Sequence, residues 1–218
     1  MVLEQRELMR GNTLIRALLA GYLSTRMEEL IDIAREQWED IDEYTLPYPK
    51  RYDAYDPLQT KVFPTVGSNV VSDGNYRRID ITDYADNEFQ ARYRMRLFCW
   101  VRTPKNAQNK SISDYYDTCL KLRDDMGAIM KAALLDTPSL GTTNEKNEPQ
   151  VMVMEDSLQT EYFDATRLSE ESGVYSAGVS INFDLDVQES LWREASGIAH
   201  TIDITADQMP SVEMEPAP

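Results

Sequence analysis

The chain has 218 residues, with 38 acidic and 22 basic side chains and a formal net charge of −16 at pH 7. Phosphate binding needs basic surface, so this balance argues against nucleic acid or an anionic membrane as the main partner, while leaving room for local basic patches. We find no signal-peptide pattern and no run of about 18 apolar residues, and therefore expect neither classical export nor a membrane anchor.

The hydrophobic content of 42% is ordinary for a globular protein, and the length is sufficient for a real core. Cys99 falls on the apolar side of a predicted strand, and Cys119 on the apolar face of a predicted helix. Both are interpreted as small core residues. This cysteine usage fits a reducing compartment, and a disulfide between the two is the less favoured alternative.

An amphipathic helix is predicted over residues 13–40, because its apolar side chains recur at intervals of three and four. The segment 41–64 is rich in proline, which excludes a helix interior or a central strand, so we expect an extended linker within the domain. Its tyrosines either attach the linker to its own domain or form a contact surface for another protein. These tyrosines are Tyr44, Tyr48, Tyr52 and Tyr55.

Two strands are predicted at 61–71 and 76–82, around a turn with the composition Ser-Asp-Gly-Asn at 72–75. A polar loop follows, with aspartates spaced three apart: Asp80, Asp83 and Asp86. This spacing differs from the alternating ligands of an EF-hand, and no glycine and bidentate glutamate follow in the required places. We therefore expect a solvated acidic turn and no metal.

The clearest pattern is the strict alternation from Glu88 to Thr103, typical of a half-buried strand at the centre of an antiparallel sheet. A helix follows, capped by Ser111 or Ser113 and ending at about Asp136, before Pro138. We expect this helix to lie across the sheet.

The irregular apolar pattern of residues 151–163 predicts a strand with a break or bulge near Asp156. Residues 175–187 alternate cleanly and predict a second long strand. The fold class expected is thus α+β: an antiparallel sheet of long strands, packed on one side by two main helices. Residues 1–195 would form this single domain, with a short helix at 188–195, and residues 196–218 an acidic, mobile tail.

The polar sides of the two long strands carry Arg92, Arg94 and Arg96 on one and Asp184 and Asp186 on the other. If the strands are neighbours, these charges can pair across the ladder and select its register. A second interpretation is that these charged residues simply form the solvent-exposed face of the sheet. A third interpretation is that the arginines form a contact between subunits, because arginine pairs well with carboxylates and this chain has many carboxylates.

No catalytic signature emerges. The single histidine, His200, lies in the tail, where a general base would be poorly held. The sequence has no Cys-x-x-Cys, no histidine pair at helical spacing and no phosphate-cradling glycine loop. We expect no enzyme activity, no cofactor and no metal, although a carboxylate enzyme without metal is compatible with so many acids.

The order of elements, from the long helix and proline-rich link to "KAALLDTPSLG" and "YSAGVSINFDLDV", resembles the tail terminator and neck proteins of long-tailed bacteriophages. The likeness spans roughly residues 13–187. It departs from that family in the long linker around Tyr44–Tyr55 and in the acidic tail after Trp192.

This resemblance implies a structural virion protein without turnover. Such a protein forms a ring, a hexamer in that family, which caps the tail tube and meets the head connector after assembly in the bacterial cytoplasm. Its partners would be further copies of itself, the tail-tube protein and the connector. Subunit contacts would then involve the charged side chains above and Tyr48, Tyr52 and Tyr55. Two alternatives stay open: a head-completion or connector adaptor with a twelvefold ring, and, more distantly, an enzyme or small-molecule-binding domain with a deep polar pocket.

Overall fold

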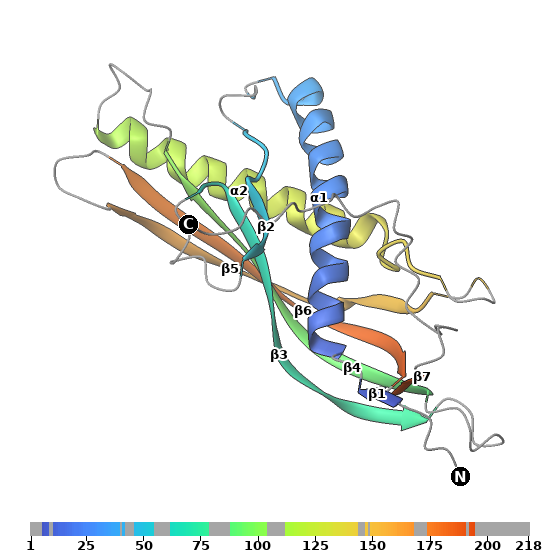
Figure 1. Cartoon of the computed structure of the whole chain (residues 1–218). Helices are drawn as coiled ribbons and strands as arrows, with labels where there is room; N and C mark the ends of the chain where they lie inside the picture. The colour runs from blue at the N-terminus through green and yellow to red at the C-terminus, as the bar shows by residue number, and fades with distance from the viewer. Residues whose placement is uncertain are drawn as a thin grey trace, which may run out of the picture.

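The part of the chain described by the computed structural model contains two helices and seven strands (Figure 1). It comprises residues 6–8, 11–39, 41, 46–54, 62–78, 88–103, 112–143, 147, 149–167, 174–190 and 192–194. In chain order the elements are β1 (Arg6–Leu8), α1 (Gly11–Gln37), β2 (Arg51–Ala54), β3 (Thr65–Arg78), β4 (Glu88–Arg102), α2 (Ile112–Asp136), β5 (Val151–Arg167), β6 (Tyr175–Ser190) and β7 (Trp192–Glu194).

Five strands form one sheet in the order β2-β3-β4-β6-β5. The four long strands are antiparallel to their neighbours, and β2 runs parallel to β3 at the edge. The predicted α+β class, with long strands and two helices, is confirmed. The sheet is nevertheless mixed, because the proline-rich segment contains a short strand where we expected only an extended linker. This strand has four residues and lies at the edge of the sheet, where a proline-rich segment can still form a short strand.

Gly67 explains how β2 reaches β3 so closely. A β-carbon at this position would lie 2.1 Å from the carbonyl oxygen of Ala54 and 2.6 Å from the ring of Phe98. Only glycine leaves room for both neighbours. The edge strand therefore depends on a single residue of β3.

The core lies between the sheet and the two helices, which cross on the same face of the sheet (Figure 1). α1 contacts β2 and β3, while α2 contacts β4, β5 and β6. The alternating apolar residues from Ala91 to Val101 of β4 and from Ala177 to Val187 of β6 point into this core. Cys99 and Cys119 are both buried and unpaired, so the interpretation as core residues is confirmed.

The helices are also joined directly. The Tyr22 hydroxyl donates a 2.6 Å hydrogen bond to the carbonyl of Ala133, and Arg26 forms an ion pair with Asp136 at 2.7 Å. None of the helices among the described residues combines the length and the apolar content needed to cross a membrane.

The hairpin turn predicted at Ser72–Asn75 is wrong, because β3 continues through it and pairs with β4 along its length. Asn75 adopts a φ of 55°, and the register shifts between Gly74 and Arg77. Asparagine tolerates this left-handed conformation, so turn-forming residues here produce a bulge. The side chains from Val71 onward are mostly exposed, so this end of β3 extends beyond the core.

The bulge predicted near Asp156 is confirmed. Met154 pairs with Asp184 and Gln159 with Asn182, so β5 takes five steps where β6 takes two. Three extra residues are an odd number, and the side chains of β5 therefore change faces across the bulge.

The short helix predicted at 188–195 is also wrong. β6 continues to Ser190, and Trp192–Glu194 forms β7, which pairs antiparallel with β1 near the N-terminus. The partner strand β1 lies near the other end of the sequence, so the residues around β7 carry no local signal for this pairing. The remaining expectations for Tyr44, Tyr55, the aspartates at 80, 83 and 86, Ser111, His200 and the tail 196–218 lie outside the described residues.

Candidate assembly interface

The sheet face opposite α1 and α2, called the open face below, carries the charged residues singled out in the sequence. β4 and β6 are direct neighbours, and their register places Arg92 opposite Asp186, Arg94 opposite Asp184 and Arg96 opposite Asn182. No helix among the described residues covers this face. The two long strands thus bring together charges that lie about ninety residues apart in the sequence.

Arg92 and Asp186 form a two-pronged ion pair. The Arg92 Nε and Nη2 atoms donate hydrogen bonds to the two oxygens of Asp186, at 2.7 and 2.9 Å. These hydrogen bonds raise the pKa of the Arg92 guanidinium, with the charge of Asp186 acting in the same direction. Such a pair fixes the register of the two strands through planar geometry that lysine cannot reproduce.

The other two arginines of this row are differently placed. Arg96 donates a 3.0 Å hydrogen bond to the side-chain oxygen of Asn182, which is neutral. Arg94 is exposed, and among the described residues it makes no ion pair or hydrogen bond with Asp184 or any other side chain. Two exposed guanidinium groups are therefore left without a carboxylate partner on the described part of their own chain.

An aromatic patch adjoins this row on the open face, formed by Phe63, Trp100, Arg102 and Phe163. Trp100 stacks on Phe163 with 5.9 Å between ring centroids and an interplanar angle of 20°. The Arg102 guanidinium lies 3.7 Å from the centre of the Phe63 ring, and its Nε atom is buried without a hydrogen-bond partner. Burial lowers the pKa of Arg102.

Sequence reasoning missed this patch. Phe98 and Trp100 fall on the polar side of the alternating strand 88–103. Aromatic residues among the arginines of that side were the signal that could have indicated the patch. Phe163 could not be assigned to a face from the sequence, because the bulge in β5 reverses the sides. In the structure Phe163 is 42% exposed on the open face, whereas the neighbouring Tyr162 lies on the helix side against Arg123.

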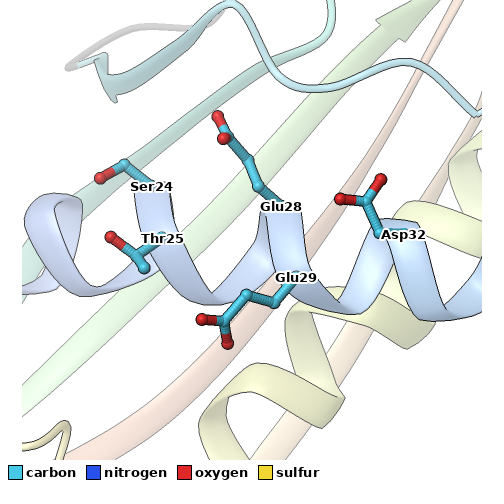
Figure 2. A pocket seen from close by; sticks show the side chains of 5 residues that line it. All are labelled: Ser24, Thr25, Glu28, Glu29 and Asp32. Atoms are coloured by element: carbon cyan, nitrogen blue, oxygen red, sulfur yellow. The ribbon is translucent and has the colours of Figure 1, made fainter.

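On the opposite side of the molecule, α1 presents an open pocket lined by Ser24, Thr25, Glu28, Glu29 and Asp32 (Figure 2). Its acids have partners within the chain: Glu29 pairs with Arg26, Asp32 with Arg35, and Glu28 accepts a 3.5 Å hydrogen bond from Tyr52. No group of three or more metal-ligating side chains occurs among the described residues. The pocket is thus an acidic surface.

Two of the predicted contact tyrosines lie against this helix. Tyr48 donates a hydrogen bond to Asp32, and the Arg35 guanidinium lies 4.2 Å from the centre of its ring. The hydrogen bond to Asp32 raises the pKa of Tyr48. Tyr52 packs against the core, and its burial raises its pKa strongly. Both side chains therefore attach the linker to its own domain, although Tyr48 stays 37% exposed.

Neither cysteine is placed to act as a catalytic nucleophile. Burial raises the pKa of Cys99 to about 12 and that of Cys119 to about 11. Both thiols are held protonated inside the core, where a substrate has no access.

The chain was also compared with known proteins. No family model matches it, and no curated protein matches it either.

Proposed function

We propose that this chain is a structural subunit of a phage neck, a tail terminator that assembles into a ring on the end of the tail tube and receives the head connector. The resemblance in the order of elements motivates the proposal, and the α+β fold with long strands is compatible with it. The observation that carries it is the open face. Arginine and aromatic side chains gathered on one face have the composition of a protein interface.

The reach of the strands adds support. β3 continues beyond the core with exposed side chains from Val71 to Arg78, among them Val71 at 52% and Tyr76 at 47% exposure. Large apolar side chains on a projecting strand suit a contact with a neighbouring subunit. The end of β3 also carries Arg77 and Arg78, which complement an otherwise acidic molecule.

The oligomeric state tests this proposal. We expect native mass spectrometry and light scattering of the purified protein to show a closed ring, with six subunits for a terminator. A twelvefold ring would instead favour the connector adaptor. A protein that stays monomeric, both alone and mixed with the tail-tube protein of the same phage, would overturn the proposal.

Location in the particle gives a second test. A tagged copy of the protein should label the junction between head and tail in electron micrographs of assembled virions. Particles made without the protein should lack joined heads and tails. Label found along the tube or on the head shell would contradict a place in the neck.

A further inference from the structure

The two outer surfaces of the molecule differ in charge. On the open face, β4 carries a row of four arginines, Arg92, Arg94, Arg96 and Arg102, while the acids near this row are Asp184 and Asp186 on β6 and Asp156 in the bulge of β5. Residues 24–39, on α1 and just after it, carry five exposed acids against two arginines. We call these five the acidic stripe: Glu28, Glu29, Asp32, Glu36 and Glu39. In a chain of net charge −16, this row of arginines makes the open face the exception.

Four members of the acidic stripe share one side of α1. At 3.6 residues per turn, Glu28, Glu29, Asp32 and Glu36 fall within a sector of roughly 100°, and Glu39 follows two residues after the helix ends at Gln37. Ile33, 42% exposed, lies at the edge of this sector, one turn from Glu29 and from Glu36. The stripe thus combines negative charge with an exposed apolar side chain.

The open face offers the matching set. Arg94 and Arg96 are exposed cations without a carboxylate partner in the described part of the chain. Beside them Trp100 and Phe163 supply apolar area. Tryptophan and arginine are the residues most enriched where interfaces gain their binding energy.

These two surfaces cannot meet within one molecule, because the sheet and its core separate them (Figure 1). They can meet between two copies. A contact that joins different surfaces of identical subunits is heterologous, and it closes into a ring when the rotation between neighbours allows.

We propose that the open face of one copy docks on the acidic stripe of the next, with Arg94 and Arg96 against the carboxylates and the Trp100–Phe163 stack near Ile33. This inference rests on the proposed function, and it names the pair of surfaces that would build the ring. The partner is a second copy of this chain. Charge complementarity between the two faces is the argument for it.

Charge reversal tests the contact. The open-face variant Arg94→Glu/Arg96→Glu leaves the Arg92–Asp186 pair intact. The stripe variant Glu36→Lys/Glu39→Lys changes acids without an ion pair among the described residues, and it places cations near the C-terminal end of α1, where the helix dipole favours them. Each variant should fold as the wild type does by circular dichroism. Each alone should weaken the contact between subunits by about a hundredfold or more, because like charges then face each other.

An equimolar mixture of the two variants should form rings again. In an alternating ring, one kind of junction is wild type, and the other joins glutamates on the open face to lysines on the stripe. Alternation needs an even number of subunits, so rescue with equal amounts of the two variants in each ring also reports even order. A chain carrying all four substitutions should assemble by itself.

A control variant is Asp117→Lys. It reverses one exposed charge on α2, on the helix side of the sheet and outside both surfaces, and should leave the ring unchanged.

Each outcome is decisive. Wild-type rings together with unaffected variants overturn this contact and leave the proposed function standing. Variants that dissociate without rescue in the mixture also overturn this pairing of surfaces. A monomeric wild type overturns the proposed function, and this contact with it.

Discussion

The indole ring of Trp100 lies over Gly178 on the neighbouring strand, where a β-carbon would come within 2.7 Å of the ring atom Cε2. The absence of a side chain at this point of β6 lets the indole settle on the sheet and stack on Phe163 from β5. One glycine therefore shapes the centre of the aromatic patch.

Gly178→Ala should destabilise the protein by about 1–2 kcal/mol, since the added methyl group pushes the indole off the sheet and breaks its stack on Phe163. Denaturant unfolding measures the loss. Gly74→Ala is the matched control, because a β-carbon at this position of β3 would meet nothing within 4 Å, and the substitution should be nearly neutral. Equal losses for both substitutions would contradict the close approach of Trp100.

The substitution Gly21→Ala should stabilise the protein. Gly21 lies in the middle of α1, and a β-carbon there meets nothing within 4 Å. Alanine narrows the unfolded ensemble and favours the helix, so we expect a gain of about 0.5–1 kcal/mol in the free energy of unfolding. A thermal melt provides the measurement, and a lower melting temperature would show that this part of α1 is packed differently.

The Arg92–Asp186 pair should show measurable coupling in a double-mutant cycle of Arg92→Ala and Asp186→Asn. The two side chains are 41% and 21% exposed, so solvent screens the pair, and we expect a coupling of about 0.5–1 kcal/mol. Arg94 and Asp184 supply the control, because they lie opposite in register without an ion pair. Their cycle should give a coupling near zero, measured at the same protein concentration. Similar coupling energies in the two cycles would show that the hydrogen-bonded ion pair adds nothing beyond the cross-strand proximity of the two charges.

The sequence predicted the elements whose signal is local. Alternation identified the strands that contain Cys99 and Val179, and three-four spacing identified both helices, since burial of one face imposes these periods. It also located the bulge near Asp156, because the apolar period breaks there. These features depend on residues that lie close together in the chain.

Features that depend on distant partners were missed. Ser72–Asn75 has the composition of a turn, but the length of β4 available for pairing keeps β3 extended through it. Likewise β7 forms against β1, and β2 forms against β3 because Gly67 admits it. The aromatic patch was missed for the same reason, since Phe63, Trp100 and Phe163 come from three separate segments. Tertiary pairing decided each case.

The buried cysteines give a prediction with a clear dependence on pH. Burial raises the pKa of Cys99 from 9.0 to about 12 and that of Cys119 to about 11, so at pH 8 the native protein should react with a thiol reagent about a hundredfold to a thousandfold more slowly than an ordinary exposed thiol. In denaturant both cysteines should react at once. The variants Cys99→Ala and Cys119→Ala identify which thiol a given reaction reports.

The same shifts affect stability. Because the native state keeps both thiols protonated, their contribution is complete below about pH 9 and is lost as the pH rises toward the raised pKa values. The raised pKa of Tyr52 acts in the same direction above pH 10. We therefore expect the free energy of unfolding to fall on the alkaline side, and to fall less in Cys99→Ala when each protein is compared with itself at pH 8. Rapid native labelling at pH 8, or an alkaline loss unchanged in that variant, would show that Cys99 is not enclosed between the sheet and the helices.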